Sequence, residues 1–226
     1  MRCEKNNSHF FIPCLFIFQS CIEIIDDLTI RKDGSGVLKY TLNLSASKVR
    51  VNSILALDSI EGVKVPSILE IKKKVALFKQ TLALQKGITN VQITENYTDF
   101  IFKFECSFTN VDLLQDGLHI SYSIISNEKS LANTNFTWLY LDSKLLRRSV
   151  PKLTTERLKK ISQKDNELLK TGSYTSITRF DHLIARFDNP LSKISKDKKA
   201  LMLKTNTYSL KEKQSILENT IYLISD

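Results

Sequence analysis

The sequence predicts an α+β fold in which antiparallel β-hairpins form a sheet with amphipathic helices packed on it. Two segments, 22–44 and 88–108, alternate apolar and polar residues on either side of a turn. A third segment, 66–86, repeats its apolar residues every three or four positions, the period of a helix that packs one face on a core. Hairpins and helices in this succession are typical of a sheet with helices laid on it.

The first twenty residues predict a lipoprotein signal peptide. Arg2 and Lys5 give a basic start, and Phe10 to Phe18 is a nearly unbroken apolar run. A run this short cannot cross about 30 Å of hydrocarbon, which requires about 20 apolar residues, so it indicates an export leader and not a permanent membrane helix. Phe18-Gln19-Ser20-Cys21 then resembles a bacterial lipobox, with Phe18 where leucine is commonest. We expect cleavage before Cys21 and acyl chains, such as palmitate, on the new N-terminal cysteine.

The other cysteines leave an alternative open. Cys21 could instead be a small buried side chain in a cytoplasmic domain whose first strand begins early, and it could then pair with Cys106. If Cys21 is acylated, Cys3 and Cys14 leave with the leader and Cys106 remains alone. Cys106 shares the apolar side of the alternating run 100–108 with four phenylalanines, so we expect it in the core and not at a catalytic site.

Length and composition predict one domain, residues 21–226. Two similar hairpin–helix units, 22–86 and 88–130, followed by a C-terminal β-rich part are a further prediction. The 42% hydrophobic and 25% charged residues are ordinary for a globular protein. The net charge of +9, from 33 basic and 24 acidic residues, suits nucleic acid, anionic lipid or a lysine-coated surface. Because exported proteins rarely meet nucleic acid, we expect no nucleic-acid partner.

The first hairpin is predicted from its turn. Strands at Ile22–Arg31 and Val37–Leu44 enclose Asp33-Gly34-Ser35-Gly36, whose glycines suit a tight turn. Ile25 and Asp26 interrupt the alternation of the first strand.

Two helices are predicted next. Ser45 to Glu61 is compatible with helix or strand, and its serine N-cap and its length favour a helix ending near Gly62. Pro66 suits the first turn of the helix 66–86, and Gly87 suits its C-terminal cap.

The remaining elements are predicted from period and caps. A hairpin has strands 88–94 and 99–108, and a helix over 111–125 begins at Thr109 or Asn110, although 118–125 alternates enough to be a strand. The C-terminal predictions are a strand 135–141, a Thr154-capped helix closed by Gly172, a long strand 174–187 bulged near Asp181, a strand 200–205, a short helix led by Ser209, and a terminal strand 221–224 that closes the sheet.

Cations predict a basic contact surface. It comprises Lys72 and Lys73 on the outer face of helix 66–86, together with Arg147, Arg148, Arg157, Lys159 and Lys160 in the most basic stretch of the chain. Such a surface suits an acidic protein, an anionic lipid or a glycan. The alternative is an ordinary solvated lysine surface.

The sequence contains no recognisable catalytic or metal-binding motif. His119 and His182 are the histidines after the leader, and no HExxH, paired Cys-His spacing or glycine-rich phosphate loop is present. Asp181 and His182 are adjacent in a predicted strand, so their side chains would point to opposite faces. We therefore predict no enzyme activity, no metal and no cofactor apart from the acyl lipid on Cys21. Carboxylates from distant segments could still form an unrecognised site.

The chain resembles a known group of lipoproteins at its two ends. Cys21, the acidic-apolar strand after it, the turn 33–36 and the next alternating strand resemble the start of Bacteroidota outer-membrane lipoproteins with an LppM-like architecture. Tyr174–Ile184, Phe187-Asp188-Asn189-Pro190 and Ser195-Lys196-Asp197 resemble their later strand region, with Asp181 where a proline is frequent. The resemblance implies the fold and the anchoring, and it transfers no functional residue.

These observations predict a lipid-anchored outer-membrane protein that acts as an interaction or scaffold module, for instance an accessory subunit of a membrane protein complex. Its expected partners are the membrane and another envelope protein. The LppM-like architecture implies binding of a lipid or glycolipid as the alternative function. Glu23, Asp26 and Asp27 resemble acidic signals that direct lipoproteins to the cell surface, so the surface and the periplasmic face of the membrane both remain open.

Overall fold

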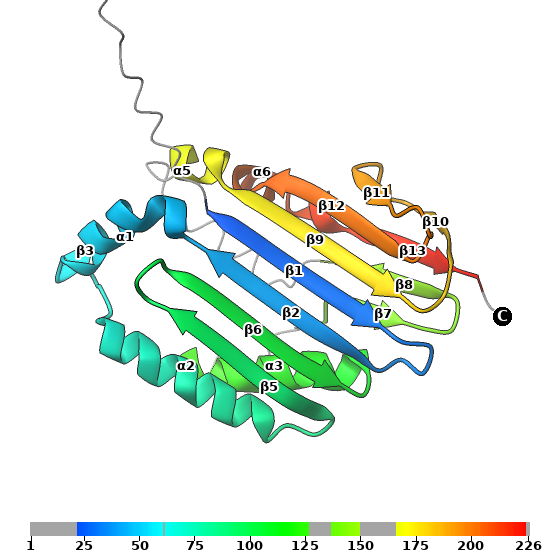
Figure 1. Ribbon diagram of the computed structural model, residues 1–226, viewed down its shortest axis with the longest axis horizontal. Helices are drawn as coiled ribbons and strands as arrows, with labels where there is room; N and C mark the ends of the chain where they lie inside the picture. The colour runs from blue at the N-terminus through cyan, green and yellow to red at the C-terminus, as the bar shows by residue number, and fades with distance from the viewer. Residues whose placement is uncertain (1–21, 61, 127–136, 150–165, 225–226) are drawn as a thin grey trace, which may run out of the picture.

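The structure, a computed structural model, describes residues 22–60, 62–126, 137–149 and 166–224, and a seven-stranded main sheet forms its centre (Figure 1). The strand order is β11-β12-β9-β1-β2-β6-β5, and neighbours are antiparallel except β1 and β9, which run parallel along their whole length. The strands are β1 (Glu23–Ile30), β2 (Gly36–Asn43), β5 (Ile88–Asn96), β6 (Ile101–Phe108), β9 (Ser173–Phe180), β11 (Ser192–Ile194) and β12 (Ala200–Asn206).

A second, four-stranded sheet lies behind the main sheet in the view of Figure 1. Its order is β10-β13-β8-β7, with β10 at Ile184–Phe187, β13 at Asn219–Leu223, β8 at Leu145–Arg148 and β7 at Leu139–Leu141. Leu28 of the main sheet and Leu146 and Ile221 of the second sheet belong to one buried cluster. The two sheets therefore share a hydrophobic core.

Two long helices cover the rest of the inner face of the main sheet. They are α2 (Ile68–Ala83) and α3 (Val111–Ser126), and Leu82 and Leu114 bury their side chains in the same core. Gly117 of α3 permits close packing, because a Cβ there would lie 3.4 Å from Leu82 of α2 and 3.2 Å from Gln85 and Ile88, which follow that helix. This arrangement confirms the predicted α+β class with helices packed on a sheet.

Shorter helices and strands lie near the ends of the main sheet. They are η1 (Ser45–Ser47), α1 (Lys48–Leu55), β3 (Ser59–Ile60), β4 (Val63–Lys64), α5 (Asn166–Thr171), α6 (Thr207–Glu212) and η4 (Gln214–Leu217). The proposed division into two similar hairpin–helix units stays a prediction.

The local predictions for the first 126 residues are largely confirmed. Both hairpins form, β1 with β2 and β5 with β6. Helix α2 begins with a capping box, in which Ser67 and Glu70 each accept a hydrogen bond from the other's backbone N–H. The expected positions of Pro66 in the first turn and of Gly87 as the C-terminal cap are wrong, because Ser67 and Leu84 are the cap residues. Asn110 accepts a hydrogen bond from Leu113 N–H at 2.8 Å at the start of α3. The alternative strand over 118–125 is wrong, because this segment continues α3.

The single helix expected over 45–61 is shorter in the structure. Helix α1 ends at Leu55, and β3 and β4 then form a small hairpin. Gly62 lies in its turn with a φ of +80°, a conformation that glycine adopts without strain. The turn therefore competes with continuation of the helix.

The long strand predicted over 174–187 is wrong, because the segment belongs to two sheets. β9 pairs with β1 and β12 as far as Phe180, whereas β10 starts at Ile184 and pairs with β13. The change of phase near Asp181 marks the crossing between sheets and not a bulge within one strand. The parallel pairing of β9 with β1, which no local pattern encodes, ends at Phe180, just before the crossing.

The C-terminal predictions have mixed outcomes. The strand over 200–205 is confirmed as β12, and the short helix as α6, although Asn206 and not Ser209 caps it. β13 lies between β10 and β8 in the second sheet, so it does not close the main sheet as expected. The predicted strand 135–141 is described from residue 137 and contains β7, and most of the predicted Thr154-capped helix lies outside the described residues.

Candidate functional site

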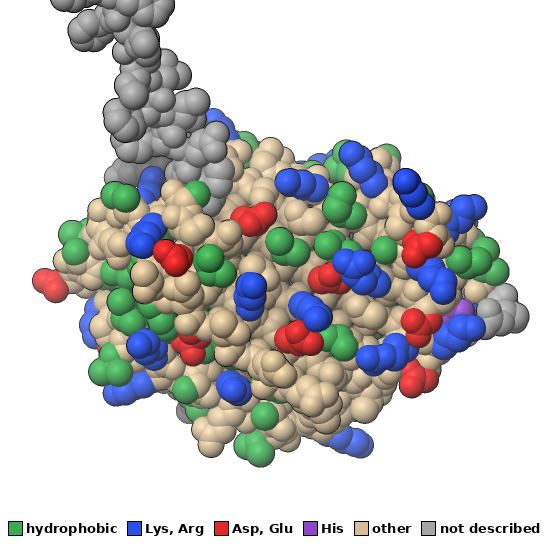
Figure 2. Space-filling view, viewed as in Figure 1, with side chains coloured by type: hydrophobic (Ala, Val, Ile, Leu, Met, Phe, Trp, Pro, Cys, Tyr) green, Lys and Arg blue, Asp and Glu red, His purple; other side chains and the backbone are tan. Residues whose placement is uncertain are grey.

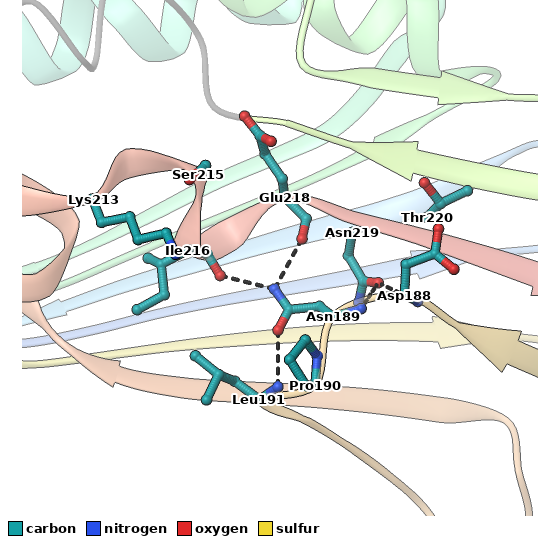
Figure 3. A pocket seen from close by; sticks show the side chains of 10 residues that line it. All are labelled: Asp188, Asn189, Pro190, Leu191, Lys213, Ser215, Ile216, Glu218, Asn219 and Thr220. Carbon is teal, nitrogen blue, oxygen red and sulfur yellow. Dashed lines mark hydrogen bonds between the residues drawn. The ribbon is translucent and has the colours of Figure 1, made fainter.

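A surface cleft of about 530 Å³ lies between the turn that follows β10 and the segment that contains η4 (Figure 3). The turn leads from β10 of the second sheet to β11 of the main sheet, and it faces the start of β13, the neighbour of β10 in the second sheet. Its lining residues are Asp188, Asn189, Pro190, Leu191, Lys213, Ser215, Ile216, Glu218, Asn219 and Thr220. Its size falls within the range of small-molecule sites, about 300–1,000 Å³.

Two buried asparagines build the walls of the cleft. Asn189 Nδ2 donates to the carbonyl oxygens of Ile216 at 2.9 Å and Glu218 at 2.8 Å, so it holds the turn against η4 (Figure 3). Asn219 Oδ1 accepts hydrogen bonds from Asp188 N–H at 3.2 Å and Asn189 N–H at 2.9 Å. Asn219 Nδ2 also donates to Ser192 Oγ at 3.1 Å, so both amides are bonded within the protein and hold the shape of the cleft.

The exposed lining of the cleft mixes polar and apolar groups. Asp188 forms an ion pair with Arg186 at 3.2 Å, and the Arg186 guanidinium stacks on the Tyr222 ring with 3.4 Å to its centroid. Glu218 adds a second carboxylate, and Leu191 is 50% exposed. Carboxylates beside apolar surface can bind a ligand that carries hydroxyl groups and an apolar face.

A polar cluster lies behind the cleft, between the two sheets. Asp26 of β1 accepts hydrogen bonds from Arg148 Nη2 of β8 at 2.7 Å, from the Tyr174 hydroxyl of β9, and from Ser176 Oγ at 3.2 Å. The guanidinium of Arg148 also lies 5.3 Å from the centroid of the Trp138 ring. The cluster thus ties the second sheet to the centre of the main sheet.

Burial sets the protonation states within this cluster. Burial and the negative charge of Asp26 raise the pKa of Tyr174 well above its ordinary value, so the phenol keeps its proton and donates a hydrogen bond to the carboxylate. Burial alone would lower the pKa of Arg148, but the neighbouring Asp26 outweighs it and the net change is upward. The Tyr174 phenol and the Arg148 guanidinium therefore both keep their protons, and the ion pair of Arg148 with Asp26 joins the two sheets.

A small cavity separates the polar cluster from the cleft. It measures about 10 Å³ and is lined by Arg148, Ser176, Thr178, Ser192, Leu201, Leu203, Leu217, Asn219 and Ile221. Arg148 Nη1 has no hydrogen-bond partner in the part of the chain that the structure describes. A space of this size accommodates about one water molecule and no acyl chain.

The structure redistributes the predicted basic surface. Lys72 and Lys73 are exposed on α2, and Lys72 Nζ lies 5.0 Å from the centre of the Tyr97 ring. Arg147 is exposed on β8 and lies over Tyr140. Arg148 was grouped with them wrongly, because it is 7% exposed and points inward.

The remaining predicted site residues, Cys21, Arg157, Lys159 and Lys160, lie outside the described residues. Cys106 is completely buried, as expected, and burial raises the pKa of its thiol to about 12. Within the described ranges, no cluster of three or more potential metal ligands is found. In those ranges no helix is both long and apolar enough to cross a membrane.

Sequence reasoning missed the residues that join the layers. Gln115 of α3 is buried, and its Oε1 accepts hydrogen bonds from the N–H groups of Trp138 at 2.6 Å and Leu139 at 2.8 Å. The sequence feature that could have revealed Gln115 is a polar side chain within an apolar helix. The signal for Asp26 was its place in the buried phase of β1, which we interpreted only as a break in the alternation. Asn219 carried no signal.

Comparisons with known proteins give little. No family model matches the chain, and no curated protein matches it. One solved structure, the folded domain of the LppM protein of Mycobacterium tuberculosis determined by NMR, is similar over 97% of this chain and 94% of that chain, with 10% identity and a TM-score of 0.39. That neighbour carries the name of the architecture that the sequence resembles, and nothing in the comparisons bears on the Bacteroidota. A TM-score this low enters none of the arguments below.

Proposed function

We propose that this protein is a lipid-anchored protein of the outer membrane whose α+β domain acts as a non-enzymatic interaction module. The observation that carries the proposal is the position of Cys21. Phe18-Gln19-Ser20-Cys21 stands directly before Ile22, whose carbonyl oxygen accepts a hydrogen bond from Ser173 N–H at 2.7 Å. β1, in the middle of the main sheet, begins one residue later. Cleavage before Cys21 therefore keeps every described element in the mature chain.

Intact mass measurement of the protein purified from its native membranes tests the anchor. We expect the mass of residues 21–226 plus covalent acyl chains. The matched control is Cys21→Ser, which should retain residues 1–20 and carry no lipid. A native product that keeps its leader and has a free Cys21 sulfur contradicts the proposal.

The cleft supports the second half of the proposal, an interaction with another envelope protein. Its shape is fixed by the buried amides of Asn189 and Asn219, while Leu191 presents apolar surface to solvent. A rigid depression with an exposed apolar side chain at its rim suits a protruding side chain of a partner.

A detergent pull-down with a matched pair of variants tests this interaction. Leu191→Arg should reduce capture of the partner roughly tenfold or more, since loss of an apolar side chain that acts as a binding hot spot costs about 2 kcal/mol or more of binding free energy. Leu84→Arg changes an apolar residue that is 78% exposed at the end of α2 and should leave capture unchanged. Equal capture by both variants, or no partner in any sample, contradicts an interaction through the cleft.

Binding of a glycolipid headgroup is the second candidate. Asp188 and Glu218 line the cleft together with the apolar Pro190 and Ile216, and such a mixture of acidic and apolar residues suits a sugar ring with its hydroxyl groups and apolar face. The cavity between the sheets, at about 10 Å³, is too small for an acyl chain, so recognition would rest on the headgroup. Native mass spectrometry should then show a bound glycolipid that Asp188→Asn weakens, whereas a ligand-free spectrum contradicts this candidate.

A further inference from the structure

The segment formed by α1 and the β3–β4 hairpin, residues 48–64, carries exposed apolar side chains; we call it the 48–64 lobe. Val49 is 81% exposed and Val63 is 71% exposed, and Leu57 and Ile60 are also exposed. Helix α1 buries none of its residues. Figure 1 shows the lobe projecting beyond the edge of the main sheet, and Figure 2 shows hydrophobic side chains gathered at that side of the molecule. Apolar residues concentrated in this way mark a contact surface.

The 48–64 lobe lies at the end of the main sheet where the chain enters β1. Glu23, the first residue of β1, is paired with Asn43, the last residue of β2. The lobe follows β2 after a single turn of 3-10 helix, and Leu44 N–H is bonded to Phe100 O at 2.9 Å. The lobe and Ile22 are therefore at the same end of the molecule (Figure 1).

The chain at this end is held tightly to the fold. The carbonyl oxygen of Ile22 accepts a hydrogen bond from Ser173 N–H, and Ile22 packs against Gly172, where a Cβ would lie 3.1 Å from that oxygen. One residue spans at most about 3.6 Å, so an acyl chain on Cys21 leaves almost no linker between bilayer and domain. The end of the sheet that carries the lobe must then face the lipid.

The charges of the lobe point to apolar insertion as the mode of contact. Residues 48–64 contain three cations and two carboxylates, a nearly neutral balance. Lys64 is already paired with Glu70 at 2.8 Å, and Lys48 with Asp99 at 3.2 Å. Electrostatic attraction to anionic headgroups would need a cluster of several cations. The contact should therefore depend weakly on salt.

We propose that the 48–64 lobe inserts Val49, Leu57 and Val63 into the surface of the bilayer that anchors the chain. The inference rests on the proposed acylation of Cys21, and it adds an oriented, two-point attachment in place of a single flexible tether. The β1 end of the main sheet then faces the membrane, and the opposite end, with the turn after β9, faces away from it.

Site-specific fluorescence on the acylated protein tests the lobe. A polarity-sensitive fluorophore is attached to Val49→Cys or Val63→Cys, and Leu84→Cys, at a residue 78% exposed, serves as the matched control. Cys106 is fully buried and stays unlabelled. The protein is placed in vesicles of phosphatidylethanolamine and phosphatidylglycerol that contain lipids with a quencher in the upper acyl chain. Labels at 49 and 63 should be quenched roughly twofold or more relative to the label at 84, because interfacial apolar groups reach about 5–10 Å into the bilayer.

A second variant separates insertion from mere proximity. In Val49→Asp/Val63→Asp, a label at Leu57→Cys should lose its quenching, and Leu84→Asp should leave it unchanged. Intact mass of the same vesicle sample reports acylation independently. An acylated protein with equal quenching at 49, 63 and 84 overturns the lobe contact and leaves the anchor standing, whereas an unacylated Cys21 overturns both. A label shielded from water but insensitive to the lipid quencher indicates contact with another protein, which also overturns the inference.

Discussion

Asp26 and Asp27 are neighbours in β1 and lie on opposite faces of the main sheet. Asp26 faces the second sheet and is held by Arg148 at 2.7 Å, with side chains 5% and 7% exposed. Asp27 points to the opposite side of the main sheet, where Arg179 donates hydrogen bonds to both its oxygens at 2.9 to 3.1 Å. Figure 2 shows basic and acidic side chains interleaved on one face of the molecule. The side chains of this outer pair are 22% and 48% exposed.

The comparison teaches that burial, and not the type of ion pair, decides what each aspartate does. A solvated pair contributes about 0–1 kcal/mol to folding, because water screens the charges. Removing one partner of a buried pair leaves the other charge in the interior without water or a counter-charge, and it lowers the free energy of unfolding by about 3–5 kcal/mol. The acidic run that resembled a surface-export signal thus contains one carboxylate, Asp26, that the folded domain conceals.

The largest expected effect is therefore at Arg148. Arg148→Met should lower the free energy of unfolding by about 3–5 kcal/mol, because Asp26 stays buried without its counter-charge. Urea unfolding followed by circular dichroism measures the change.

The double variant Asp26→Leu/Arg148→Met serves as the control, because it removes both charges together. It should recover most of the stability, since a buried pair replaced by apolar residues of similar volume is often neutral. A single-variant loss below about 1 kcal/mol would show that the inner pair behaves like a surface pair.

A variant of Gln115 tests whether the contacts between the layers of the fold need charged groups or only hydrogen bonds. Gln115→Leu should cost about 1–3 kcal/mol, because the N–H groups of Trp138 and Leu139 lose their acceptor in the interior. Gln80→Leu, on the exposed side of α2, is the matched control and should stay within about 0.5 kcal/mol. The same unfolding experiment measures both, and equal losses would contradict a bridging role for Gln115.

The hairpins and helices could be predicted because their signals are local. The Asp33–Gly36 turn, the apolar period of residues 66–86 and the alternation around Cys106 each determine their own segment, whatever lies across the molecule. Residues 45–61 were compatible with helix or strand, and the structure contains both, because α1 ends at Leu55 and the β3–β4 hairpin follows it.

The layered site could not be predicted, because its partners are chosen by tertiary packing. Arg148 lies 122 residues from Asp26 in the chain, and β1 pairs in parallel with β9 about as far away. The sequence places Asp26 at an apolar position of its strand, which indicates a buried charge without saying which cation meets it. Arg148 looked like one more surface cation, because neighbouring residues of a strand face opposite ways and β8 itself was not recognised.

The smallest expected loss of stability is at Arg179, and its dependence on salt distinguishes the outer ion pair from the buried one. Arg179→Met should lower the free energy of unfolding by about 0.2–1 kcal/mol at low ionic strength, because the pair with Asp27 is partly solvated. The loss should shrink at about 1 M salt, where the screening length falls to about 3 Å, while the loss caused by Arg148→Met should persist because salt does not reach the buried pair. Urea unfolding of both variants at the two salt concentrations makes the measurement. If the stability lost in Arg179→Met were the same at both salt concentrations, the two-pronged contact of Arg179 with Asp27 would protect its charges from salt as well as burial protects Arg148. The ion pairs on the two faces of β1 would then not differ in their response to salt.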